Sequence, residues 1–135
     1  MHRLGRAVAI ITSVLLVASL TLIVPGVVGL GSSPLLVLGL ALGSVGLYAV
    51  RDRIGNIGLI GDVNVGAILR VSWVGSVIGT VLALLVLGAS PGELQATGGL
   101  CGLAGMANYF LRPVYSLVYG AGRRLDSLRS GAGRN

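Results

Sequence analysis

The chain has 135 residues, of which 54% are hydrophobic and only 10% are charged, and its formal net charge is +6. Soluble domains carry about 25% charged residues, and a domain this small has too little interior to hide so much apolar surface. The composition therefore excludes an ordinary water-soluble domain and predicts a single domain embedded in a membrane.

Four apolar stretches follow one another along the chain, each close to the roughly 20 residues that a helix needs to cross a bilayer. They are 7–24, 34–50, 71–89 and 94–111, and the last reaches 119 if Pro113 only bends the helix. We expect Pro25 to end the first stretch, since proline interrupts the helical hydrogen bonds. We also expect this stretch to be a retained helix, because its apolar run is longer than the roughly 7–15 residues of a signal peptide.

The positions of the arginines predict how the four spans are oriented. All ten basic residues are arginines, and they are Arg3, Arg6, Arg51, Arg53, Arg70, Arg112, Arg123, Arg124, Arg129 and Arg134. They precede the first span, lie between the second and third, or follow the fourth. The loops 25–33 and 90–93 contain no arginine, and their only charged residue is Glu93. Because arginine-rich segments stay in the cytoplasm, we expect an all-α, four-helix transmembrane bundle with both termini inside and short outer loops.

The aromatic residues mark the same inner boundary independently. All six lie near the inner ends of the spans, namely Tyr48, Trp73, Tyr109, Phe110, Tyr115 and Tyr119. Tyr and Trp favour the level of the lipid headgroups, where a ring can be partly dry and partly wet. We therefore interpret them as interfacial anchors.

Glycines at spacings of three or four residues predict close contacts between helices, because small residues let helix backbones approach in lipid. The candidate packing positions are Gly39, Gly43, Gly46, Gly75, Gly79, Gly98, Gly102 and Gly105. The pattern favours a compact bundle or a homo-oligomer. It leaves open which contacts form within one chain and which form between copies.

The sequence has no set of residues suited to catalysis or to metal binding. General acid–base chemistry needs positioned titratable groups, and metal sites need several donors together, but the only histidine is His2 and no acid lies within a span. Cys101 is interpreted as a small buried hydrophobe, since no basic residue near it would stabilise a thiolate. We expect no enzymatic activity and no cofactor. A small multidrug exporter is disfavoured as well, because the first span lacks the embedded glutamate of those exporters.

Two further segments are expected on the inner side. The loop from Arg51 to Gly66 is predicted to be a flexible or partly interfacial connector, with Asp62 and Asn64 capping the third span. In the basic tail 120–135, the candidate contacts to an anionic partner are Arg123, Arg124, Arg129 and Arg134. Nucleic acid, anionic lipid headgroups and an acidic protein all stay open as partners, as does a role in orientation alone. Contact with nucleic acid would be to phosphates, because no base-reading module is present.

With four spans, minimal outer loops and a basic inner side, the chain resembles the small internal membrane proteins of haloarchaeal pleomorphic viruses (pleolipoviruses). The resemblance covers the whole chain and rests on architecture and composition, without a diagnostic motif. It implies a structural protein of a virion envelope or host membrane that lies beneath the spike and faces the enclosed genome. Two alternatives stay open, a holin-like or channel-forming protein and an accessory subunit of a larger membrane complex.

Overall fold

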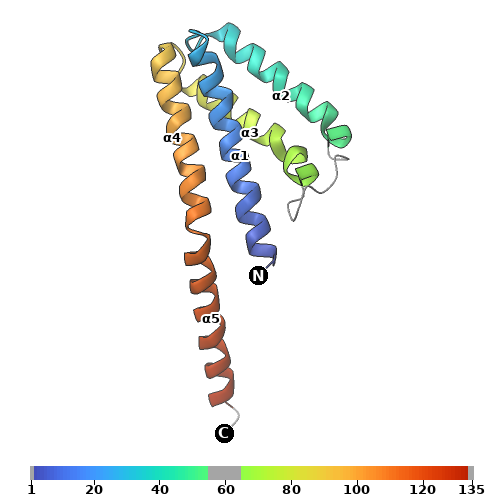
Figure 1. Cartoon of the computed structure of the whole chain (residues 1–135), viewed down its shortest axis with the longest axis vertical. Helices are drawn as coiled ribbons and strands as arrows, with labels where there is room; N and C mark the ends of the chain where they lie inside the picture. Colours follow the sequence, from blue (N-terminus) through green and yellow to red (C-terminus); the bar gives the residue numbers. More distant parts are fainter. Residues whose placement is uncertain (1, 55–64, 134–135) are drawn as a thin grey trace.

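A computed structural model describes residues 2–54 and 65–133, and these residues form five α-helices (Figure 1). The helices are α1 (His2–Val27), α2 (Pro34–Ile54), α3 (Val65–Leu85), α4 (Pro91–Phe110) and α5 (Arg112–Ala132). The described residues contain no strand, and the predicted all-α class is confirmed. Within these residues, three helices are long and apolar enough to cross a membrane, over Arg3–Val27, Pro34–Arg53 and Gly66–Leu85.

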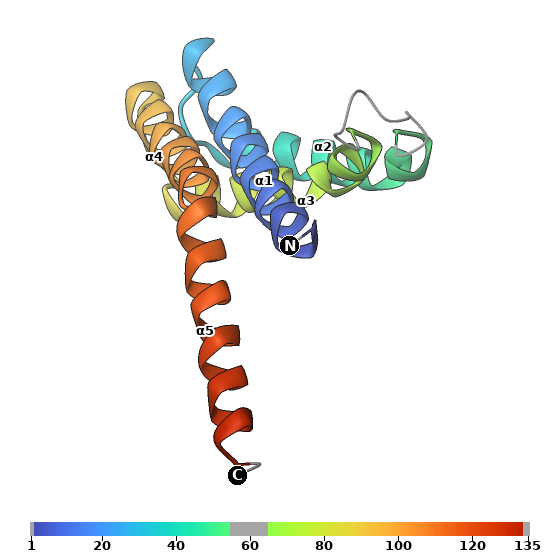
Figure 2. The ribbon, with the colours of Figure 1, turned by 60° about the horizontal axis from the view of Figure 1, so that its bottom comes forward.

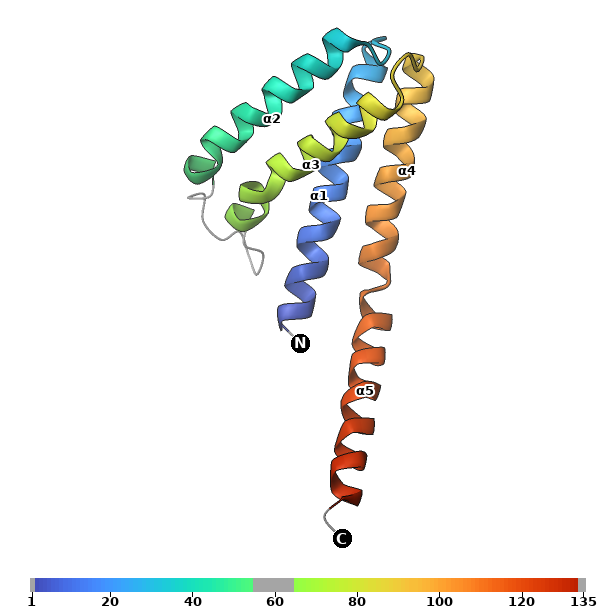
Figure 3. The same cartoon turned by 180° about the vertical axis from the view of Figure 1, so that it is seen from behind.

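Helix α1 lies at the centre of the fold and packs against both α3 and α4 (Figures 1 and 3). Helix α3 runs parallel to α1, whereas α4 runs antiparallel to it, and α2 packs mainly against α3. The α2–α3 pair leans away from α1 and α4, and α5 extends beyond the other helices (Figure 2).

Most large apolar side chains lie on the outside of this arrangement. The largest side chains that are fully buried belong to Leu22 and Leu94, whereas Leu35 is 79% exposed and Phe110 is 75% exposed. Soluble monomers rarely expose contiguous apolar surface of this extent. The exposed surface therefore suits lipid, in agreement with the hydropathy of the three apolar helices.

The prediction that Pro25 ends the first helix is wrong, because α1 continues to Val27. Pro25 lies in the last turn, where its missing N–H removes only one bond of the helix. The helix then closes in a Schellman arrangement, in which the Leu30 N–H donates to Pro25 O at 2.9 Å and the Gly29 N–H donates to Gly26 O at 3.0 Å. Gly29 has a φ of 85°, a left-handed conformation that glycine adopts without steric cost.

The two connectors 28–33 and 86–90 are hydrogen-bonded to each other. The Ser32 N–H donates to Ala89 O at 2.9 Å, and the Gly88 N–H donates to Ser32 O at 2.8 Å. The Ser32 hydroxyl donates to Ala83 O in the last turn of α3 at 2.6 Å. Gly88 has a φ of 89°, and this turn ends α3 at Leu85, earlier than the expected end at residue 89.

Helix α4 begins at Pro91, slightly before the expected position 94, because a capping box forms at Ser90. The Glu93 N–H donates to Ser90 Oγ at 3.3 Å, and the Ser90 N–H donates to Glu93 Oε2 at 2.7 Å. A carboxylate in the first turn also complements the helix dipole. The only acid of the predicted outer loops therefore has a local structural role.

A break at Leu111 separates α4 from α5. Pro113 has no N–H to donate to Tyr109 O, which interrupts the helical hydrogen bonds at this point. Leu111 keeps near-helical angles (φ −76°, ψ −6°), and the Tyr115 N–H donates to Leu111 O at 2.9 Å as α5 begins. Helix α4 thus ends at Phe110, and α5 follows after the single residue Leu111, so the helix is interrupted beside Pro113. The basic tail is helical as far as Ala132.

Several expectations fall outside the described residues. They concern the connector over 55–64, the caps by Asp62 and Asn64, and the position of Arg134. The described ends of that connector belong to helices, because α2 extends to Ile54 and α3 already begins at Val65.

Candidate functional site

Two of the candidate packing glycines bring α3 against α1. A Cβ atom built on Gly75 would lie 2.5 Å from the Val14 carbonyl oxygen, and one on Gly79 would lie 2.8 Å from Thr21 Cβ. Both distances are shorter than a van der Waals contact, so neither position accepts a larger residue without a shift of the helices. Gly75 and Gly79 therefore lie in a contact within the chain.

Three further candidate glycines bring α4 against the same central helix. The built Cβ of Gly98 would lie 2.9 Å from Ser19 O, that of Gly102 would lie 2.8 Å from Ser19 Oγ, and that of Gly105 would lie 3.1 Å from Leu15 Cβ. Gly26 of α1 makes an equally close approach from the other side, because a Cβ atom built on it would lie 2.7 Å from Pro91 O. The sequence interpretation missed Gly26, because it assigned this residue to a helix end.

The remaining candidates, Gly39, Gly43 and Gly46, do not contact another helix of the chain. A Cβ atom built at any of the three would meet no heavy atom within 4 Å. Side chains next to them are also exposed, Leu38 at 57% and Leu42 at 64%. This face of α2 is therefore open in the single chain.

Paired polar side chains also join the helices, and the sequence interpretation did not single them out. Asn108 Nδ2 donates to Thr12 Oγ1 at 3.1 Å and to Val8 O at 3.4 Å, linking α4 to α1. The hydroxyls of Ser44 on α2 and Ser76 on α3 are 2.8 Å apart. Among the described residues, every buried side-chain nitrogen or oxygen has a hydrogen-bond partner. Such pairing is what a lipid environment requires of polar groups.

An apolar groove of about 560 Å³ lies between α2 and α3. Its lining residues are Ala41, Ser44, Val45, Tyr48, Trp73, Val77, Thr80 and Val81. The Tyr48 and Trp73 rings meet edge-to-face with centroids 4.9 Å apart. The Arg51 guanidinium lies 3.7 Å from the Tyr48 ring centroid and donates to Tyr48 O at 2.7 Å. An aromatic pair under an arginine is an arrangement suited to the headgroup level of a bilayer.

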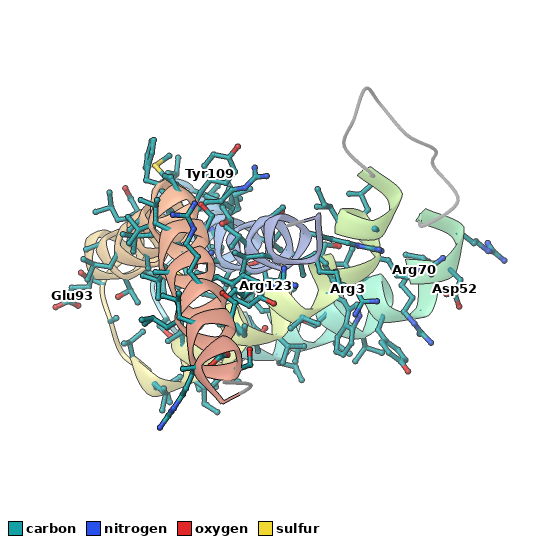
Figure 4. The ribbon with its side chains drawn as sticks, turned by 90° about the horizontal axis from the view of Figure 1, so that it is seen from below. Arg3, Asp52, Arg70, Glu93, Tyr109 and Arg123 are labelled. Carbon is teal, nitrogen blue, oxygen red and sulfur yellow. The ribbon has the colours of Figure 1, made fainter. Side chains whose placement is uncertain are left out.

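The candidate anionic-partner contacts Arg123, Arg124 and Arg129 lie on α5 and are exposed. The Arg123 guanidinium carbon is 5.8 Å from the Tyr119 ring centroid. Figure 4 shows that Arg3, Arg70 and Arg123 come from three different helices and do not converge on one point. These three arginines therefore do not form a pocket for one small ligand.

The described side chains do not bring reactive groups together. The thiol of Cys101 is partly buried between α4 and α1, with Sγ 3.6 Å from Leu15 O. The described residues contain no group of three or more His, Cys, Asp or Glu side chains that could hold a metal ion. Comparison of the chain with protein-family models, curated proteins and solved structures finds no match.

Proposed function

We propose that this chain is a non-enzymatic structural protein of a lipid envelope that crosses the bilayer four times, with both termini inside. One observation carries the proposal, the separation of charge from the short connectors. The described arginines of α1, α2 and α3 lie toward the helix ends that are remote from the connectors 28–33 and 86–90 (Figures 1 and 4). An arginine-rich side is the cytoplasmic side of a membrane protein.

The fourth crossing is assigned to α4, although this helix is not among the three that are long and apolar enough to cross by composition alone. Its 20 residues would span about 30 Å at 1.5 Å per residue. Glu93 is bonded at the outer end of the helix, and Asn108 is bonded to α1 near the inner end. Its low hydropathy therefore comes partly from polar groups that are hydrogen-bonded within the protein. Its antiparallel packing on α1 favours a crossing beside that helix.

The short outer side supports a structural role over a receptor or a surface enzyme. The two connectors bond to each other through Ser32, Gly88 and Ala89, which leaves little chain to project from the outer face. The resemblance to internal membrane proteins of pleomorphic viruses suggests that the membrane is a virion envelope. In that setting the arginine-rich side would face the enclosed interior.

The exposed side chains of α2 bear on the alternative of a channel. They include Leu35, Leu38, Leu42 and Val45, and these residues suit lipid or another apolar helix rather than a water-filled lumen. The hydroxyls of Ser44 and Ser76 bond to each other instead of lining an open path. The arrangement therefore favours a sealed membrane component.

The test is to produce the chain alone in cells and to expose intact cells to a membrane-impermeant dye and to trypsin. Because the chain is proposed to be a sealed membrane component, we expect intact cells to exclude the dye. Because trypsin cuts after lysine and arginine, and every such residue is an arginine on the proposed inner side, we expect the chain to remain uncut. Permeabilised cells should show cleavage after Arg123 and Arg124. Entry of the dye would replace the structural role with a channel, and cleavage from outside with the dye excluded would contradict the orientation.

A further inference from the structure

Among the described helices, α5 is the one that does not pack against the bundle beyond its first turn. None of its residues is buried, and it extends away from the other helices in every view (Figures 1, 2 and 3). It approaches α1 only near its beginning, where Arg112 lies beside Gly5. A helix of 21 residues without tertiary packing gains little stability from propensity alone and needs a surface to cover one of its faces.

The sequence of α5 divides this helix into an apolar face and a polar face. With about 100° of rotation per residue, seven apolar residues fall within an arc of about 100°. They are Val114, Leu117, Val118, Ala121, Leu125, Leu128 and Ala132. The large members of this set are all exposed, among them Leu117 at 72%, Leu125 at 67% and Leu128 at 70%. The opposite side carries Ser116, Arg123, Ser127 and Ser130.

Two arginines stand at the borders between these faces, one on each side. In the same projection Arg124 lies about 20° outside one edge of the apolar arc, and Arg129 lies about 20° outside the other. An arginine at such a border can lay its stem along apolar surface and extend its guanidinium toward phosphate. This placement is typical of helices that lie in the surface of a bilayer.

We propose that α5 lies flat on the inner surface of the bilayer, with its apolar face among the acyl chains and Arg124 and Arg129 on anionic phospholipid headgroups. In Figures 1 and 3, α5 continues beyond the end of α4 in much the same direction. To lie flat on the bilayer it would bend further at Leu111, where Pro113 has already interrupted the hydrogen bonds. Tyr109 and Phe110 would mark the headgroup level just before the turn. The inference rests on the membrane location proposed above. The contact of α5 with headgroups does not need four crossings, whereas the side of the bilayer on which it lies follows from them.

A second copy of α5 fits this face less well than a membrane does. Val114, Val118, Ala121, Leu125 and Leu128 are spaced as in the seam of a coiled coil. However, Arg124 and Arg129 would then flank the seam on both chains and face arginines of the partner helix. Like charges at these flanking positions oppose pairing, whereas an anionic surface complements both borders of the helix.

Nucleic acid is the other anionic candidate, and the distribution of charge disfavours it. Phosphate contacts by a helix need basic side chains gathered on one face. Here the apolar face separates Arg124 from Arg129, so a helix that bound nucleic acid through either arginine would leave Leu125 and Leu128 in water. Burial of that apolar face is the larger gain.

The test uses the full chain in lipid nanodiscs, whose two faces are both open to water. With Cys101 replaced by alanine, a fluorophore is attached at Ala121→Cys, in the centre of the apolar face, or at Ser130→Cys, about 180° away. We expect spin labels on the acyl chains to quench the label at position 121 and aqueous iodide to quench the label at position 130. The contrast should be larger in discs that contain phosphatidylglycerol than in discs of phosphatidylcholine alone.

Charge variants compare the border arginines, Arg124 and Arg129, with Arg123 on the polar face. Arg124→Gln combined with Arg129→Gln should abolish most of the difference between the two kinds of disc. Arg123→Gln is the matched control on the polar face and should preserve most of that difference. None of these side chains packs in the bundle, so the fold is not expected to change.

Three outcomes would overturn the inference. Equal quenching of both positions by iodide would place α5 in water, and protection of position 121 only after addition of duplex DNA would favour nucleic acid. Protection of position 121 from both quenchers would favour a second copy of α5. A chain that fails to elute with the discs would instead contradict the membrane location, and with it the proposed function.

Discussion

At the scale of single residues, glycines of α3 and α4 allow these helices to pack closely on α1, because a side chain at these positions would collide with atoms of α1. Gly75, Gly79, Gly98 and Gly105 each lie against atoms of α1, and in lipid this close backbone approach is a main source of association between helices. The spacing of these glycines predicted that they would pack. Spacing alone could not distinguish them from Gly39, because identical patterns occur on an open helix face and on a covered one.

Gly98 and Gly99 form a matched pair for testing this packing. A Cβ atom at Gly98 would lie 2.8 Å from Ile23 Cγ1 and 2.9 Å from Ser19 O, whereas one at Gly99 would meet nothing within 4 Å. Gly98→Ala should therefore lower the free energy of unfolding by about 1–3 kcal/mol, the usual cost of overpacking. Gly99→Ala should be neutral or stabilising by up to about 1 kcal/mol. Circular dichroism during titration with a denaturing detergent measures both, and equal effects of the two variants would contradict the assigned interface.

At the scale of elements, the connectors 28–33 and 86–90 hold the helix ends together. Ser32 is 4% exposed, and its hydroxyl is bonded to Ala83 O in the last turn of α3. Ser32→Ala should lower the free energy of unfolding by about 1–3 kcal/mol, because the buried carbonyl loses a partner. Ser127→Ala removes a comparable bond, to Arg124 O at 2.8 Å, on an exposed face of α5. This control should change stability by less than about 0.5 kcal/mol, and a loss as large as that of Ser32→Ala would show that the connector bond has no special role.

Hydropathy predicted the positions of the first three helices well and their ends less well. The helix ends depend on single backbone bonds, such as those of Gly29 and Gly88, which composition does not reveal. The amphipathic character of α5 was missed although its signal was present, in the recurrence of apolar residues three and four positions apart over 114–132. The four arginines in 120–135 favour an interpretation based on charge, and composition alone does not distinguish a basic tail from an amphipathic helix.

At the scale of the whole molecule, the account depends on whether α4 crosses the membrane. Its hydropathy does not place it with the three apolar helices, and the assignment rests on its antiparallel packing against α1 and on polar groups that are bonded at its ends. If α4 lay outside the bilayer, residues 92 and 122 would be on the same side. If it crosses, they are on opposite sides, and α5 is inside.

The most direct test of this central claim is the accessibility of a single thiol at each end of α4. With Cys101 replaced by alanine, Gly92→Cys and Gly122→Cys both place the new side chain in open space, so neither should disturb packing. In intact cells, a membrane-impermeant maleimide should label position 92 and leave position 122 unlabelled until the cells are permeabilised. Labelling of both positions from outside, or of position 122 alone, would contradict the four-crossing arrangement with both termini inside.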